Sequence, residues 1–412
     1  MHAFVLTAFF FKNHLTNSNH HSYCNRFEMY ILLIVFTIFA TAFGSEWVID
    51  SSTDSGMIIG VGVGGVNAAI AAANSDSQGP IRTLYDGSKW KQELGVIQAG
   101  MVLDGAISKD GKTSVYSCMG GLQISTDSGA TYSSKQGLIG LSQDVHMFGS
   151  DSNSMGAIGN FKVLPSSDDM KPGTYNGIAF STDGAGVKWD FSTIPNENYP
   201  RYGDFPSDNT WYVSAGMWNS TESTTTITDN RDMHLSHRLK VDLKNMKKVM
   251  KRDLTEGTDG WYGAIYKTND AGKTWTNVYK SLLGETWYFN QIACPTEDLC
   301  VAVGEGQQGS LPYVVAVVSN DGGKTWKKTL ESNDYPSLMG VVMTSATEGF
   351  ITPANSGRVT GTDFLVTTDA GQTWTLSQTL GSCYCIDVDS KGGLGVASCL
   401  TQADGAIAMY KP

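Results

Sequence analysis

The residues whose type and spacing could carry chemistry are aspartates that recur in one fixed setting. The pattern Ser/Thr-x-Asp-x-Gly-x-Thr-Trp is complete at 268–275, 319–326 and 367–374, and a copy ending in Tyr covers 125–132. Degenerate copies lie at 85–90 and 181–189. An aspartate that precedes a Gly and a Thr in this way can accept bonds from nearby backbone N–H groups and close a turn. We therefore interpret these carboxylates as turn clamps rather than catalytic groups.

Each position of the octapeptide has a structural reason. Gly two residues after the Asp can take positive φ, Thr returns the chain to an extended conformation, and Trp buries a large apolar surface against a neighbouring strand. The residues expected in these roles are Asp86, Asp127, Asp183, Asp270, Asp321, Asp369, Gly129, Gly272, Gly323, Gly371, Trp275, Trp326 and Trp374. The motif therefore predicts a β-hairpin turn that recurs along the chain.

A second repeating feature, two apolar strands joined by a polar turn, precedes these turns. Examples are 145–147 with 155–158, and 341–343 with 350–352. Counting from 47–50 paired with 57–61 to 383–388 paired with 394–398 gives seven such pairs. Seven pairs and six aspartate turns predict seven units of about 50 residues, as expected for a repeat architecture.

The motif resembles the Asp box of BNR-repeat β-propellers, over roughly Trp47 to Pro412. The resemblance implies an all-β fold, a single propeller of seven four-stranded blades, and boxes between the third and fourth strands of each blade. The blade style is most similar to photosystem II assembly factor-like propellers and to sortilin- and sialidase-type propellers. Because these proteins differ in function, the resemblance implies an architecture and leaves the activity open.

The first 45 residues have the character of a targeting leader. Residues 30–43 are apolar and uncharged, too short to span a bilayer as a helix, and end in small residues typical of a signal-peptide cleavage site. Met29 is an alternative start. We expect a secreted protein; an organelle lumen and retention through the apolar segment are the alternatives. Asn219 lies in an Asn-Ser-Thr glycosylation pattern.

Six cysteines follow the leader, an even number that is compatible with an oxidising compartment. Cys294 and Cys300 flank a four-residue polar turn, so a hairpin would place them opposite each other. Cys399 can likewise face Cys385 or Cys383. We expect no metal site, because no His accompanies either cluster, and no cofactor.

The stretch between the boxes at 181–189 and 268–275 is too long for one blade. Trp189 and Trp275 are 86 residues apart, against 51 from Trp275 to Trp326. The excess, at about 219–258, contains a basic segment from Arg231 to Arg252 with eight Lys or Arg and two Asp. One interpretation is a solvated hairpin that extends the blade; the other is a docking site for an acidic partner or a membrane surface.

Function is expected to lie on the loops at one end of the propeller. The candidate loop residues are Arg201, Tyr202, Trp211, Trp218, Trp287, Tyr288 and Arg358. Aromatic groups with an Arg could hold a sugar or a peptide. The net charge of −11 argues against nucleic acid. We expect a monomeric, non-catalytic platform that binds a protein or a glycan.

The alternative is a glycoside hydrolase, sialidase-like or otherwise exo-acting, with carboxylates at the channel mouth. Sialidases need three arginines around the substrate carboxylate, and outside the basic segment the region after the leader offers only Arg82, Arg201 and Arg358. Their sequence contexts differ from those of sialidases. Other glycosidases need two carboxyl groups across the scissile bond, which the sequence cannot select among 40 acidic residues.

Overall fold

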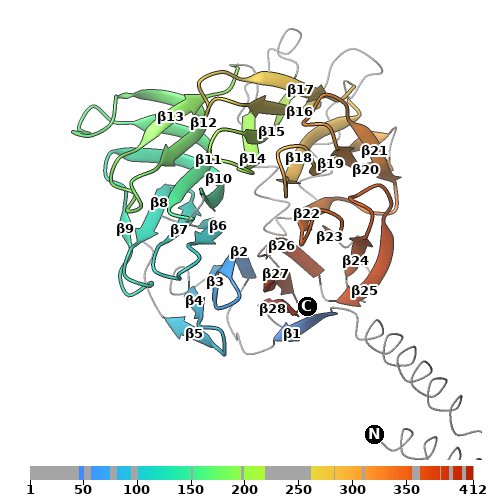
Figure 1. Cartoon of the computed structure of the whole chain (residues 1–412), viewed down its shortest axis with the longest axis horizontal. Coiled ribbons are helices and arrows are strands. Elements are labelled where there is room, and N and C mark those ends of the chain that lie inside the picture. Colours follow the sequence, from blue (N-terminus) through green and yellow to red (C-terminus); the bar gives the residue numbers. More distant parts are fainter. Residues whose placement is uncertain are drawn as a thin grey trace, which may run out of the picture. The chain divides into compact units, whose positions relative to one another are not determined.

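The computed structural model describes residues 46–50, 57–74, 81–93, 101–149, 152–195, 199–218, 261–282, 284–308, 311–354, 362–380, 382–388, 393–400 and 405–411. Within these ranges all regular secondary structure is β-strand, and the strands form seven antiparallel four-stranded sheets. Figure 1 shows the sheets as blades around a centre. The predicted all-β, seven-bladed propeller is confirmed.

The innermost strands surround the axis, and each contacts the innermost strand of the next blade. From blade 1 to blade 7 they are β2 (Met57–Gly65), β6 (Val102–Ile107), β10 (Leu138–Phe148), β14 (Tyr199–Asp204), β18 (Thr286–Ala293), β22 (Leu338–Met343) and β26 (Ser382–Val388). In each blade the remaining three strands follow outward.

The outer strands of blades 1 to 6 follow their inner strand in chain order. They are β3 (Ala68–Asn74), β4 (Ile81–Tyr85), β5 (Trp90–Glu93), β7 (Ser114–Cys118), β8 (Gly121–Ser125), β9 (Ser133–Ser134), β11 (Ser154–Val163), β12 (Gly173–Ser181), β13 (Asp190–Thr193), β15 (Trp211–Trp218), β16 (Trp261–Thr268), β17 (Thr276–Lys280), β19 (Cys300–Gln308), β20 (Leu311–Ser319), β21 (Lys327–Ser332), β23 (Gly349–Pro353), β24 (Thr362–Thr367) and β25 (Thr375–Leu380).

Blade 7 closes the ring with both ends of the propeller. It consists of β26, β27 (Gly395–Leu400), β28 (Gly405–Lys411) and the N-terminal strand β1 (Glu46–Asp50), which pairs with β28 at the outer edge. The expected pairing of 47–50 with 57–61 is therefore wrong. Residues 57–61 begin blade 1, whereas β1 supplies the fourth strand that blade 7 would otherwise lack.

The hydrophobic core is divided into seven clusters, one at each junction between neighbouring blades. At the junction of blades 5 and 6, for example, Val301 and Val314 of blade 5 pack with Val341 and Ile351 of blade 6. Middle strands are buried on both faces, which explains their continuous apolar runs. No blade has an apolar core of its own in the described residues, so stability depends on contacts between blades.

The box aspartates clamp their turns as the motif predicts. Asp270 accepts bonds from the backbone N–H of Thr274 at 2.8 Å, its hydroxyl at 2.6 Å, and the Thr268 hydroxyl at 2.6 Å. The same bonds from the box Thr recur at Asp127, Asp321 and Asp369. The boxes lie between the third and fourth strands of their blades.

The backbone of the box is more unusual than predicted. Gly272 has φ of 79°, as expected, but Ala271 before it also has a positive φ of 55°. Two successive left-handed residues make the turn tight, and a small side chain at the first of them limits the steric cost. The box Trp then contacts the preceding blade, because the Trp275 indole N–H donates to the hydroxyl of Ser192 on β13 at 2.8 Å.

Two disulfides are formed. Cys294 pairs with Cys300 across the β18–β19 hairpin, as predicted. Cys399 pairs with Cys383, the other residue considered, and not with Cys385. Cys383 and Cys399 are direct register partners on β26 and β27, which brings their side chains together. Cys118 is a buried free thiol.

Several predictions fall on residues outside the described ranges. They are the leader at 1–45, Asn219, the basic segment from Arg231 to Arg252, and Arg358. Within the described part of the chain no helix is long and apolar enough to cross a membrane.

Candidate functional site at the hub of the propeller

Every inner strand carries an irregularity in its pairing with the second strand of its blade. The shifts lie between 58/60, 102/104, 142/144, 200/202, 289/291, 338/340 and 383/386. A bulge increases the local twist and re-aims the following side chain. In blades 2, 3 and 5 the following residue is Asp104, Asp144 or Gln291, and all three line the central cavity.

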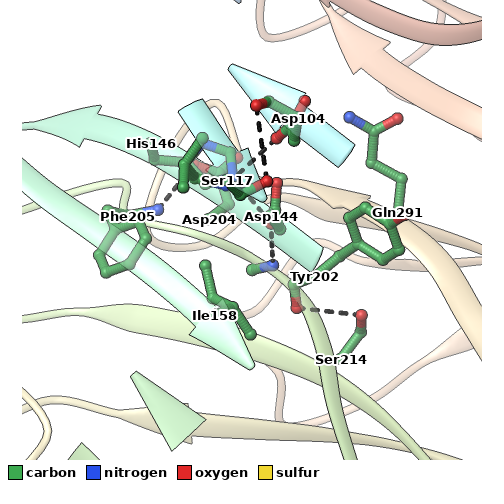
Figure 2. A network of polar contacts seen from close by, with 12 residues as sticks. Asp104, Ser117, Asp144, His146, Ile158, Tyr202, Asp204, Phe205, Ser214 and Gln291 are labelled. Atoms are coloured by element: carbon green, nitrogen blue, oxygen red, sulfur yellow. Dashed lines mark hydrogen bonds and ion pairs between the residues drawn. The ribbon is translucent and has the colours of Figure 1, made fainter. Parts of the chain in front are cut away.

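These three side chains each accept a hydrogen bond from the backbone of the next blade. Asp104 accepts the backbone N–H of Val145 at 3.1 Å, and Asp144 accepts that of Gly203 at 2.7 Å. The Gln291 side-chain oxygen accepts the N–H of Val341 at 3.0 Å. In each case the donor lies on the inner strand of the following blade. Figure 2 shows these three side chains, with dashed lines for the bonds that Asp104 and Asp144 accept.

Two further aspartates, nearer the ends of the inner strands, also form hydrogen bonds between neighbouring blades. Asp204 in blade 4 accepts the N–H of Cys294 in blade 5 at 2.6 Å. Asp387 in blade 7 accepts the N–H of Val63 in blade 1 at 2.7 Å, and so spans the junction where the ring closes. Hydrogen bonds to charged groups are among the stronger ones, so the hub holds blades together through side-chain-to-backbone bonds.

Blades 1 and 2 meet differently. Gly60, Gly62 and Gly64 on β2 approach the β6 backbone so closely that a Cβ on Gly62 would lie 2.2 Å from the Gly105 carbonyl oxygen. The glycine-rich run 60–65 thus allows the backbones of blades 1 and 2 to pack closely.

A cavity of about 550 Å³ occupies the hub. Its lining runs from the middle of the inner strands to the hairpin turns that follow them, including Lys109, Asp208 and Pro295. The Asp boxes lie on the same face, because box backbones bond to these hairpin turns: Ala271 N–H donates to Asn209 C=O at 3.0 Å. The cavity therefore opens on the Asp-box face, and its size is that of a small-ligand or side-chain pocket.

His146 is the imidazole in this cavity and pairs with Asp144, Nε2 to Oδ2, at 3.0 Å. Its side chain keeps 27% exposure, whereas that of Asp144 keeps 3%. Burial alone would lower the pKa of His146, but the charges of Asp144, Asp204 and Asp104 outweigh it and raise that pKa to about 10. The three carboxylates therefore favour the protonated form of His146, which lies beside them in the hub (Figure 2).

Two of the hub aspartates are harder to ionise than usual. Burial raises the pKa of Asp387 to about 7, although the Val63 N–H and the charge of His146 oppose it. Burial also raises the pKa of Asp204, against the opposing effects of His146 and the Cys294 N–H. Perturbed carboxylates in a cavity are candidates for function, and also for structural charge networks. Here each of them already accepts two backbone N–H groups.

The predicted loop residues lie on strands. Arg201, Tyr202, Trp211, Trp287 and Tyr288 belong to β14, β15 and β18 and are at most 5% exposed. They fail as loop residues because each is buried within the ring of blades. Trp218 ends β15, and its side chain lies outside what the structure describes.

Two of these residues nevertheless take part in a network. The Arg201 guanidinium lies 3.8 Å from the centre of the Tyr288 ring, whose hydroxyl donates to Glu305 at 2.5 Å. Asn290 joins Glu305 at 3.2 Å to the Ser337 hydroxyl of blade 6 at 3.0 Å. Arg201, Tyr288 and Glu305 are at most 2% exposed, so a substrate has no access to them.

The hub residues Asp104, Asp144, His146, Asp204, Gln291 and Asp387 were not singled out from the sequence. The available signal was an acid inside an otherwise apolar inner strand, as in Val102-Leu103-Asp104-Gly105-Ala106. That signal does not say which acids meet at the axis. In the described residues no group of three or more His, Cys, Asp or Glu is arranged to hold a metal ion.

The comparisons with known proteins agree with this architecture. A BNR/Asp-box repeat family model matches residues 317–328, the box of blade 5. No curated protein is significantly similar in sequence. The seven four-stranded blades and the repeated boxes together make this chain an Asp-box β-propeller.

Solved structures resemble the chain in fold at low identity. U3-55K is 10% identical with a TM-score of 0.52, over 89% of this chain and 98% of that one. YCF48 bound to D1 peptide is 11% identical with a TM-score of 0.39, over 89% and 97%. An ancestral GH74 enzyme is 13% identical with a TM-score of 0.49, over 82% of this chain and 40% of that one. Of these three, the likeness to U3-55K supports the fold, and none of them indicates a function.

Proposed function

We propose that the protein is a non-catalytic binding platform for a protein or glycan partner, and that the partner enters the hub cavity on the Asp-box face. The observation that carries the proposal is a preformed cavity whose polar walls are fixed by bonds between blades. A rigid site loses little conformational entropy on binding. The volume of the cavity, about 550 Å³, lies within the range of pockets that hold small ligands.

The engagement of the carboxylates supports binding over hydrolysis. A glycosidase needs one carboxyl group free to give up a proton and a second free to attack or to activate water. The oxygens of Asp204 and Asp387 instead accept backbone N–H groups, and Asp144 is shared between His146 and the N–H of Gly203. These bonds support a role for the hub aspartates in holding neighbouring blades together.

The glycoside hydrolase alternative has one observation in its favour. The pKa of Asp387, raised to about 7, would suit a general acid, and Asp144 and Asp204 line the same cavity. Release of sugar from a glycoside panel that Asp387→Asn abolishes, in a protein that still folds, would establish the hydrolase and refute the platform.

Binding can be tested by saturation-transfer NMR with a panel of monosaccharides and blocked single amino acids. Val63 lines the cavity and is half-buried, so Val63→Trp would fill it. Val48 is 58% exposed on β1 and does not line the cavity, so Val48→Trp is the matched control. We expect a probe that binds the wild type and the control but not Val63→Trp. Binding that survives Val63→Trp unchanged would place the site elsewhere.

We also propose that the propeller works in an oxidising compartment, outside the cell or in an organelle lumen. Two disulfides support this. N-terminal sequencing of the mature protein would distinguish cleavage near residue 45 from retention of the apolar segment. Glycosylation at Asn219, the docking role of Arg231 to Arg252, the monomeric state and the lack of nucleic-acid binding remain predictions.

A further inference from the structure

The hub cavity has two chemically different sides. Blades 2, 3 and 4, which are neighbours in the ring, supply four of the aspartates that line it. Blades 1, 5 and 6 supply no charged residue to the lining, and their contribution includes Val61, Val63, Ile292, Val341 and Met343. A guest that contacts both sides must therefore join an apolar part to a polar part.

The lining contains more acidic than basic side chains. Its five carboxyl groups are Asp104, Asp144, Asp204, Asp208 and Asp387. The basic residues are His146 and Lys109, and Lys109 is exposed at the mouth. The acids remain in the majority even when Asp204 and Asp387, whose pKa values burial raises, are left out of the comparison.

This excess of acid favours a positively charged guest. Walls of low dielectric constant focus the field of the charges that they enclose, so a cavity lined by one sign of charge attracts the other. His146 shows the effect within the protein, because burial opposes its protonation and the nearby carboxylates nevertheless raise its pKa. A cation beside Asp204 and Asp387 would favour their ionised forms for the same reason.

We propose that the hub cavity receives a lysine or arginine side chain of a protein partner, with the charged end beside the aspartates of blades 2 to 4 and the aliphatic stem against blades 1, 5 and 6. These two residue types bury an apolar stem while their charged end keeps polar company. The proposal rests on the proposed function, and it selects a protein rather than a glycan as the partner.

Blocked amino acids test whether the guest must be a cation. The probes are the N-acetyl N-methylamides of lysine, arginine, norleucine and glutamate, titrated into the full chain and followed by saturation-transfer NMR. Norleucine retains an aliphatic stem without the charge of lysine. We expect the lysine and arginine probes to bind about fivefold more tightly than norleucine, the upper range for an exposed ion pair, and more tightly than glutamate. Added salt should reduce this preference.

Two exposed residues at the mouth allow the charge to be changed in both directions. Asp208→Asn removes an acid, and we expect the affinity for the lysine probe to fall about two- to fivefold. Lys109→Gln removes a base, and the affinity should rise by a similar factor. Asp168→Asn is the matched control, because Asp168 is exposed between β11 and β12 on the opposite face and does not line the cavity.

The outcomes separate this inference from the proposed function. Equal affinity for lysine and norleucine, or a lysine affinity that neither Asp208→Asn nor Lys109→Gln changes, would overturn the cationic guest. If a neutral sugar binds, Val63→Trp abolishes that binding and no cationic probe binds, the platform stands and the cationic guest is wrong. If no probe binds, or if binding survives Val63→Trp, both proposals fail.

Discussion

Trp47 lies on β1, the outer strand of blade 7 that closes the ring. Among the side chains of this outer edge, its removal should lower the free energy of unfolding most. It is 1% exposed on β1 and packs on Phe350 and Phe364 of blade 6 and Tyr410 of blade 7, with ring centres 5.7, 5.2 and 5.4 Å away. Gln378 of blade 6 fixes the strand by accepting the Trp47 N–H at 3.0 Å and donating to its C=O at 2.9 Å. Trp47 therefore joins the N-terminal strand to two blades.

We expect Trp47→Ala to lower the free energy of unfolding by about 4 kcal/mol, within the range of about 3 to 5 kcal/mol for large aromatic residues removed from a core. Within the described part of the chain the indole N–H has no hydrogen-bond partner, so the loss comes from packing alone. Trp47→Phe should cost less than Trp47→Ala, because an aromatic ring is retained and the cavity left behind is smaller. Urea denaturation followed by circular dichroism measures both changes.

The neighbouring residue supplies the control. Val48 lies on the same strand but is 58% exposed, so Val48→Ala should change stability by no more than about 0.5 kcal/mol. If Trp47→Ala loses less than about 1 kcal/mol, far below the cost of emptying a packed aromatic site, β1 does not contribute to closing the ring and the reasoning fails. A loss equal to that of Val48→Ala would have the same meaning.

Three further predictions concern the boxes, the disulfides and the glycine packing. Bonds from box Thr side chains lower the pKa values of Asp127, Asp270 and Asp321 to about 2. The stability that these aspartates contribute to folding should therefore be complete above about pH 4 and lost as the pH falls toward 2. An acid-unfolding curve with no loss of stability in that window would contradict the role of the aspartates in the turns. Replacing Cys383 and Cys399 by Ala should lower the free energy of unfolding by about 3 kcal/mol, and replacing Cys294 and Cys300 by about 2 kcal/mol, because the first disulfide closes a loop of sequence separation 16 and the second a loop of 6. The reverse order in urea denaturation would contradict this loop-entropy argument. Gly62→Ala should lower the free energy of unfolding by about 1 to 3 kcal/mol, because its Cβ would collide with the β6 backbone. Gly65→Ala, whose Cβ would meet no atom closer than 3.6 Å, should be near neutral. Equal shifts in melting temperature for the two variants would be inconsistent with close packing of blades 1 and 2.

The residues that line the hub cavity could not be predicted from the sequence in the way that the boxes were. Arg201 and Tyr288 combine residue types typical of a ligand site, yet they are buried at the junction of blades 4 and 5. Asp104 and Asp387 look like isolated acids in apolar strands, yet both line the hub cavity. An aspartate's type does not reveal its exposure, and only the bulges and the closed ring determine which acids face the hub.

The sequence by itself determined the local features: the box turns, six of the seven predicted strand pairs, the number of blades and the Cys294–Cys300 hairpin. Each depends on residues within a few positions of one another, so hydrogen-bonding capacity and conformational preference suffice. Only the tertiary structure decided that β1 completes blade 7, that Cys399 joins Cys383, and that the hub aspartates clasp successive blades. These contacts join segments up to several hundred residues apart, and they form because seven blades without cores of their own must bury their faces against one another in a closed ring.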